Sequence, residues 1–218
     1  MWSIGYATLF VASATLPLVY CHHTQHGWNW SQAVLVLFSA INFMICCWEL
    51  SLFYFRHLVK SQYTSMARKL PQGCLPQPMF LFQDVPMREA LGLKHWAQVW
   101  STYSLMDPSY SDQTTFGFII DAGNGHVTLV PTILFALCLT WDLVPARLMG
   151  VIGIIMHYQE LYGTVMYFFS YFLNGRWRGR PGLQVVLVAN TIWILGPALG
   201  MHVCYQFIME GTYSAVRL

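Results

Sequence analysis

Five apolar stretches, each long enough to cross a bilayer, constrain this chain more than any other feature of its sequence. They cover 2–20, 33–55, 116–141, 148–173 and 184–209. A bilayer core of about 30 Å needs about 20 helical residues. Only 9% of the 218 residues are charged, whereas a soluble domain carries about 25%. The sequence therefore predicts an all-α polytopic membrane protein, with five transmembrane helices in a single membrane domain. Prolines are expected to bend three of these helices: Pro17, Pro131 and Pro197.

The distribution of basic residues favours five crossings. Five spans place the N-terminus, the second loop and the fourth loop on one side of the membrane. That side then holds nine of the eleven Lys and Arg residues: Arg56, Lys60, Arg68, Lys69, Arg88, Lys94, Arg176, Arg178 and Arg180. The other side holds Arg147 and Arg217. By the positive-inside rule, the N-terminus is expected in the cytoplasm, or in the stroma or matrix of an organelle.

The connecting segments carry few regular patterns. In the long loop 56–110, Pro71 and two later prolines exclude a long helix crossing the loop. Met87–Met106 mixes apolar and polar residues, which predicts an interfacial helix before the third span. The first loop, Cys21–Trp30, holds three histidines that in principle suit a metal. A wet interfacial loop anchored by its tryptophans is the favoured interpretation.

Polar residues inside the apolar stretches are the candidates for function. An ionised Asp in mid-membrane costs roughly 2.5–3.5 kcal/mol on insertion scales, so a partner must offset that cost. Glu49, Asp121 and Asn190 stand in the second, third and fifth stretches. His157 and Glu160 share a helix face, and a local pair is the favoured interpretation. Either a buried ligand site or a hydrogen-bonded knot between helices accounts for such a set.

Several aromatic and polar residues follow a recognisable order in the C-terminal two thirds. The pattern W-x-x-Y-x-x-x-D-x-x-Y is formed by Trp100, Tyr103, Asp107 and Tyr110. Asp121 stands fourteen residues after the Asp of that pattern. The segment 161–168 reads LYGTVMYF, beginning with Leu161, Tyr162 and Gly163. In the last stretch, Asn190 and Trp193 are followed four residues later by Pro197.

In order and spacing these motifs resemble the EXPERA family, which includes emopamil-binding protein (the sterol Δ8–Δ7 isomerase) and the sigma-2 receptor. The isomerase carries Glu where this chain has Asp121. The resemblance implies an EXPERA-like bundle with a cavity between spans two to five. It covers about 100 residues, and the first 90 residues match by topology alone.

The resemblance also implies roles in moving a double bond of a sterol or isoprenoid. One acid protonates an alkene carbon, and a base removes a proton from a nearby carbon. Asp121 and Glu49 would be the acid and base, and Trp193 would lie beside the cationic intermediate. Asn190 would position a carboxylate or a ligand hydroxyl. The other ligand contacts would be Trp100, Tyr103, Asp107, Tyr110 and Tyr162.

Each of these residues also has a structural interpretation. Glu49 could bond to a neighbouring helix, and Asp121 could cap its own helix. Asn190 and Trp193 could hold helices together. The tyrosines and Trp100 could anchor the chain at the membrane interface.

The second stretch departs from the family pattern. The isomerase has H-x-x-x-E there, but Ile45 stands four residues before Glu49, so the catalytic His is absent. Asn42 could take the place of the His only if the Glu were lost. The sequence therefore leaves open whether the chain is an enzyme. If it is one, the expected activity is that of a sterol or isoprenoid double-bond isomerase. Two alternatives are a non-catalytic subunit of a respiratory or photosynthetic complex, and a lipid receptor or trafficking factor.

Composition limits the remaining partners. The net charge is +2 and no basic run is present, which argues against nucleic-acid binding. No metal or cofactor is predicted, while a bound lipid, sterol or pigment is compatible with the sequence. Histidines at 126, 157 and 202 are interpreted as hydrogen-bonded rather than as haem or chlorophyll ligands. Membrane lipids and other subunits are the expected partners. The membrane would be the endoplasmic reticulum for a sterol protein, or an inner organelle or thylakoid membrane for a complex subunit.

Overall fold

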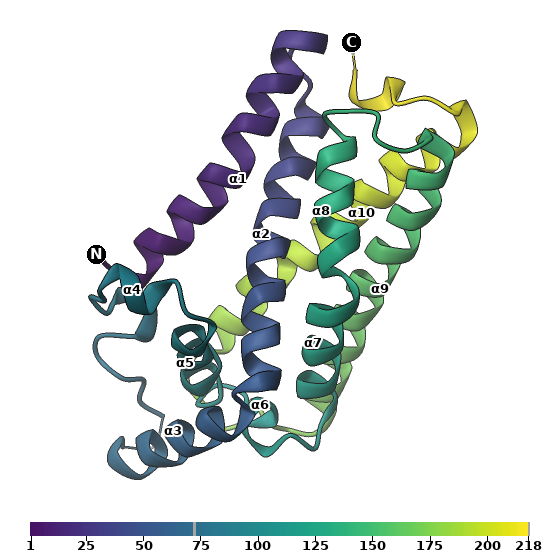
Figure 1. Ribbon diagram of the computed structural model, residues 1–218. Coiled ribbons are helices and arrows are strands. Elements are labelled where there is room, and N and C mark those ends of the chain that lie inside the picture. The colour runs from purple at the N-terminus through teal and green to yellow at the C-terminus, as the bar shows by residue number, and fades with distance from the viewer. Residues whose placement is uncertain (72, 218) are drawn as a thin grey trace. The chain divides into compact units, whose positions relative to one another are not determined.

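The fold is helical throughout the part of the chain that the computed structural model describes, residues 1–71 and 73–217, where no strand forms (Figure 1). The helices are α1 Ser3–His26, α2 Trp30–Tyr54, α3 Arg56–Lys69, α4 Met87–Ala90, α5 Leu93–Tyr103, α6 Ser109–Asp112, α7 Phe116–Val127, α8 Leu129–Cys138, α9 Ala146–Leu173 and α10 Leu183–Glu210, with 3-10 turns η1 Phe80–Phe82 and η2 Ser214–Val216. The predicted all-α class is confirmed.

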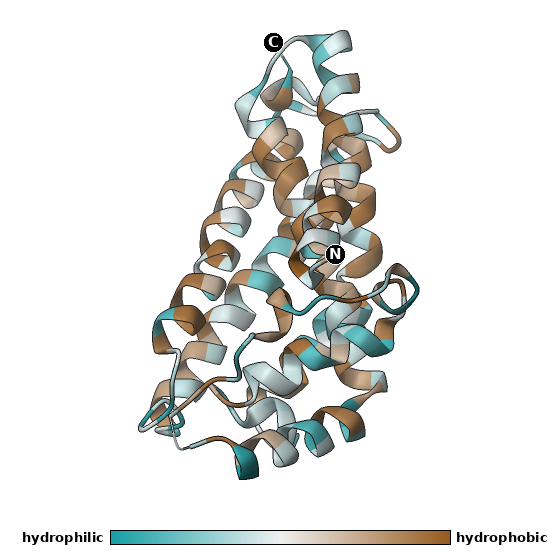
Figure 2. Cartoon of the chain, turned by 90° about the vertical axis from the view of Figure 1, so that its left-hand side faces the viewer, coloured by the Kyte–Doolittle hydropathy of each residue, from teal (hydrophilic) through white to brown (hydrophobic). Residues whose placement is uncertain are grey.

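Each of the five predicted stretches is helical, and Figure 2 shows hydrophobic residues along the long helices. Among the described residues, α1, α2 and α10 are long and apolar enough to cross a membrane, and α7 with α8 makes a fourth crossing if the pair forms one broken span. α9 has 28 residues. Its centre carries His157, Gln159 and Glu160, which lower its mean hydropathy. A helical membrane protein is therefore supported, and five crossings remain a prediction.

Two segments predicted as loops are helical instead. α1 continues through the histidines to His26, and Gly27, with φ +80°, follows its end. The predicted loop 56–110 begins with α3, because Arg56–Lys69 contains no Pro or Gly that would stop a helix. The single interfacial helix predicted over Met87–Met106 is two helices, α4 and α5.

The third predicted span is broken into α7 and α8 at Thr128. Pro131 is the third residue of α8. A proline lacks the N–H that would bond to the carbonyl of Val127 four residues earlier, and in the first turn of a helix that N–H has no partner within the helix anyway. Pro131 therefore lies in the first turn of a new helix, next to the break, whereas Pro17 and Pro197 lie within the continuous helices α1 and α10.

The chain forms two compact units. The first unit comprises Met1–Thr8, Cys46–His126 and Gly163–Asn190, and the second unit comprises Leu9–Ile45, Val127–Tyr162 and Thr191–Leu218. In the first unit, α5 packs against α3, α4, α6 and η1. Its Trp100 Nε1 donates to the carbonyl of Trp48 in α2 at 2.7 Å. The N-terminus belongs to this unit, where Ser3 Oγ lies 3.1 Å from His95 Nε2.

The second unit is held by a core of apolar side chains and by close helix contacts at glycines. The buried core is Leu35, Val36, Phe135, Cys138, Leu139, Ala146, Met149, Met156, Val203, Cys204, Phe207, Tyr213 and Val216. In α10, Gly196 and Gly200 form a G-x-x-x-G pair, a spacing that lets helices approach closely. A Cβ on Gly196 would lie 2.4 Å from the Phe38 ring, and one on Gly200 would lie 2.3 Å from His157 Nε2.

Replacing Gly200 with Ala should destabilise the protein. The added methyl group forces the buried His157 ring to move, and overpacking of this kind costs about 1–3 kcal/mol. Gly123→Ala is the matched control, because Gly123 is also helical and a Cβ there meets nothing within 4 Å. That control should raise the free energy of unfolding by up to about 1 kcal/mol through helix propensity. The free energy of unfolding of both variants is measured in mixed micelles. Equal losses in Gly200→Ala and Gly123→Ala would contradict the tight contact between Gly200 and His157.

Candidate functional site

A network of buried polar side chains in the second unit is centred on Asn42 of α2. Asn42 Nδ2 donates to Glu160 Oε1 at 2.7 Å and to Thr132 Oγ1 at 2.8 Å. Its Oδ1 accepts a hydrogen bond from Trp193 Nε1 at 3.2 Å. Asn42 is 3% exposed. One amide therefore uses both donor hydrogens and its acceptor to join α2 to α8, α9 and α10.

The carboxyl group of Glu160 is held from both sides. Its Oε1 accepts from Asn42, and its Oε2 lies 3.0 Å from His157 Nδ1. The side chains of His157 and Glu160 are 0% and 1% exposed, so this is the local pair that the sequence predicted. A hydrogen on His157 Nδ1 can be donated to the Glu160 carboxylate, which accepts hydrogen bonds on both oxygens.

The second nitrogen of His157 is the unusual feature of this network. Within the described residues, His157 Nε2 is buried and makes no hydrogen bond. The ring is enclosed by apolar and aromatic groups: its centroid is 5.0 Å from that of Phe135 and 6.0 Å from that of Phe38. A carboxyl group beside an imidazole can hold or exchange a proton.

A second polar cluster lies in the first unit, around Asp107. Asp107 is 1% exposed. Its Oδ1 accepts from the backbone N–H of Ser109 at 3.0 Å, and its Oδ2 accepts from the Tyr167 hydroxyl at 3.1 Å. The Tyr103 hydroxyl lies 3.5 Å from that of Tyr167 and accepts from Asn190 Nδ2 at 3.2 Å. The structure thus links Tyr103, Asp107 and Asn190, three of the predicted site residues, in one hydrogen-bonded cluster with Tyr167.

Aromatic rings pack around this cluster. The Tyr110 ring centroid is 4.9 Å from that of Trp100 and 5.2 Å from that of Tyr103. The Tyr110 phenol and the carboxyl group of Asp121 lie close enough to interact electrostatically. Burial raises the pKa of the Tyr110 phenol well above its ordinary value, and the negative charge of Asp121 raises it further. The W-x-x-Y-x-x-x-D-x-x-Y residues and Asp121 therefore form one local cluster.

The remaining predicted site residues lie apart from these contacts. Glu49 is buried and packs closely against Gly125 of α7: a Cβ added to Gly125 would lie 2.8 Å from the Cβ of Glu49. Gly125 stands one helical turn after Asp121 on the same helix. Glu49 thus faces the side of α7 that carries Asp121. Tyr162 is 50% exposed, and its ring stacks on Tyr158 with the centroids 5.9 Å apart.

Asn190 and Trp193 were expected to share one role, and their hydrogen-bond partners differ. Asn190 bonds to Tyr103 and to the carbonyl of Val186, whereas Trp193 bonds to Asn42. Three residues had no role in the sequence-derived site: Asn42, Thr132 and Tyr167. The sequence did offer a sign of Asn42, because it is an amide within an apolar stretch. The family motif, however, places its polar residue four positions before Glu49, where this chain has Ile45.

Comparison with known proteins adds no assignment: no protein-family model and no curated protein matches this chain.

A double-mutant cycle should show that Asn42 and Trp193 are coupled. Trp193→Phe removes the indole N–H, and Asn42→Ala removes its acceptor. We expect a coupling energy of about 0.6 kcal/mol, and up to about 1.7, the range for hydrogen bonds between membrane helices. Unfolding of the four proteins in mixed micelles measures it. A control cycle of Asn42→Ala with Trp30→Phe, where Trp30 is 73% exposed, should be additive. Additivity in both cycles would contradict the bond.

The raised pKa of Tyr110 predicts a loss of stability at alkaline pH. The folded protein resists ionisation of this phenol, whereas the unfolded chain ionises it near pH 10. Its contribution is therefore complete below about pH 10 and declines as the pH rises above that value. Tyr110→Phe should reduce the slope of unfolding free energy against pH by up to about 1.4 kcal/mol per unit. Unfolding at several values between pH 8 and 11 measures the slope. Exposed Tyr20→Phe should leave it unchanged; equal slopes in all three proteins would refute the prediction.

Proposed function

We propose that this chain is a five-span, EXPERA-like membrane protein that binds a sterol- or isoprenoid-type lipid against Trp193. The observation that carries the proposal is the hydrogen bond from the Trp193 indole to buried Asn42. Trp193 itself is only partly buried. Because its N–H is tied, the plane of the ring is restrained before a ligand arrives, which lowers the entropy cost of binding.

The pairing of polar groups in α9 supports a fifth span. A lone Glu or His would make this helix costly to place in a bilayer. Here Glu160 is bonded to Asn42 and His157, so much of that cost is offset inside the second unit. The 28 residues of α9 reach about 42 Å, which exceeds a bilayer core.

The same network supplies the chemistry that the second span lacks. EXPERA isomerases are expected to carry a His near the carboxylate there, and this chain has Ile45. His157 and Glu160 of α9 offer an imidazole and a carboxyl group within bonding distance. Such a pair could give a proton to an alkene carbon and take one from a carbon nearby. The face of Trp193 would stabilise the cation formed between the two steps. Asp121 and Glu49 remain the alternative acid and base.

Sterol binding by the purified protein tests this proposal. Trp193→Ala should weaken binding of a photoreactive sterol about tenfold or more, because the aromatic contact surface is lost. Trp30→Ala is the matched control, since it removes an exposed indole. Equal labelling of Trp193→Ala and the unaltered protein would exclude a lipid site at Trp193.

Catalysis is tested separately by incubation with a Δ8 sterol and analysis for the Δ7 product. Turnover that falls in Glu160→Gln while sterol labelling persists would assign the proton chemistry to the His157–Glu160 pair. If the unaltered protein is labelled by the sterol but forms no Δ7 product, it binds sterols without isomerising them, as a binding protein or receptor would.

A non-catalytic subunit of a larger membrane complex is the second candidate. The observation that favours it is that Asn42 has all its hydrogen-bonding groups occupied within the chain. A network satisfied in this way holds helices together without needing a ligand. Sizing in a mild detergent separates the candidates: a 25.0 kDa chain that runs alone with a bound sterol supports the pocket. A chain recovered only in a much larger particle supports the subunit.

A further inference from the structure

One face of α3 carries a continuous row of basic and hydroxyl side chains. We call this row the α3 polar stripe: His57, Lys60, Ser61, Thr64, Ser65, Arg68 and Lys69, which together line one surface depression. Their spacing alternates between three residues and one, so they share one side of the helix. α3 also contains Arg56, and its sequence, RHLVKSQYTSMARK, includes neither Asp nor Glu.

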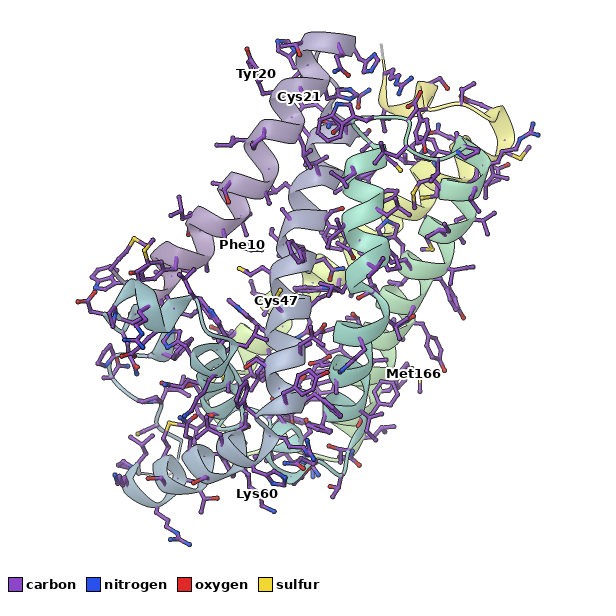
Figure 3. The ribbon with its side chains drawn as sticks, viewed as in Figure 1. Phe10, Tyr20, Cys21, Cys47, Lys60 and Met166 are labelled. Carbon is purple, nitrogen blue, oxygen red and sulfur yellow. The ribbon has the colours of Figure 1, made fainter. Side chains whose placement is uncertain are left out.

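The opposite face of α3 is fixed to the first unit. Val59 is 0% exposed, and Ser101 Oγ of α5 donates to Gln62 Oε1 at 2.6 Å. Gln113 Nε2 donates to the carbonyl of Arg56 at 3.2 Å. With that face held, the α3 polar stripe is turned outward, and Lys60, labelled in Figure 3, projects away from the helix.

The position of α3 in the sequence brings it to the edge of the membrane. α2 is long and apolar enough to span, and it ends at Tyr54. Phe53 and Tyr54 are exposed aromatic residues, the type that gathers at the membrane–water interface. The guanidinium of Arg56 lies 5.3 Å from the Phe53 ring centroid. α3 begins there and runs across the end of α2 instead of continuing it (Figure 1).

The charges of the α3 polar stripe are not neutralised by neighbouring carboxylates. Lys60, Arg68 and Lys69 take part in none of the ion pairs found among the described residues. The nearby turn before α10 adds further positive charge: Arg180 Nη1 donates to the Tyr63 hydroxyl of α3 at 3.4 Å. Asp112, the acidic residue of α6, is already paired with Arg176 at 2.5 Å.

We propose that the α3 polar stripe binds the headgroups of anionic phospholipids in the leaflet next to the end of α2. Clusters of Lys and Arg directly beside a transmembrane helix are attracted to the negative surface of a membrane. Exposed serine hydroxyls can donate hydrogen bonds to the same phosphate oxygens that the cations attract. The positive charge of the stripe matches this occupant, and its lack of Asp and Glu excludes a basic partner.

Titration of the full-length protein in a nonionic detergent with phosphatidylserine tests the proposal, with binding measured by microscale thermophoresis. Lys60→Ser, Arg68→Ser and Lys69→Ser are combined in one variant. Each cation near an anionic surface contributes on the order of a fivefold change in affinity. The triple variant should therefore lose about tenfold or more. The matched control combines Arg88→Ser, Lys94→Ser and Arg147→Ser, which removes three other exposed cations. It should lose less than about threefold.

Two further measurements use the unaltered protein, so they test the proposal even if the triple variant fails to fold. In the unaltered protein, binding of phosphatidylserine should weaken steeply when salt is raised from 0.1 to about 0.5 M, and phosphatidylcholine should bind far less. Equal losses in the two triple variants, insensitivity to salt, or equal binding of both lipids would overturn the proposal. Displacement of phosphatidylserine by millimolar inorganic phosphate would also overturn it, in favour of a site for free phosphate.

Discussion

The hydrogen bonding of Asn42 is the constraint on which the second unit depends. In an apolar environment a polar side chain must find its partners inside the protein, because neither lipid nor packed side chains can offer them. Asn42 meets this requirement for itself and for Glu160, Thr132 and Trp193 at once. Four helices of the second unit are therefore held in one arrangement by a single amide, and the glycines of α10 allow the approach that these bonds need.

In the first unit, tyrosine hydroxyls supply the hydrogen-bond partners of the buried polar groups. Asp107 is satisfied by a backbone N–H and by Tyr167, and Tyr103 links that pair to Asn190. Because each phenol combines a large apolar ring with one polar atom, a cluster of them fills space and still satisfies a buried carboxylate. A site of this kind is rigid, since moving one ring would break the bonds of the next.

A network that holds helices together can also prepare a site for a ligand. The bond that secures Trp193 restrains its ring, and the bonds that secure Glu160 keep a carboxyl group beside an imidazole. A structural role for these residues is therefore compatible with the proposed lipid site. The α3 polar stripe differs, because its cations are exposed and lack carboxylate partners among the described residues, so any role it has is at the surface.

The sequence alone determined where the long helices lie and that the protein is a helical membrane protein, because hydropathy over about 20 residues is a local property. It also indicated the local His157–Glu160 pair and an interruption of the third stretch near Pro131, which depend on neighbours along the chain. It missed α3, because a polar helix has no hydropathy signal. Only the tertiary structure decided that Trp193 belongs with Asn42, and Asn190 with Tyr103. Those partners are separated by 151 and 87 residues, so packing between helices, which no local pattern encodes, selects them.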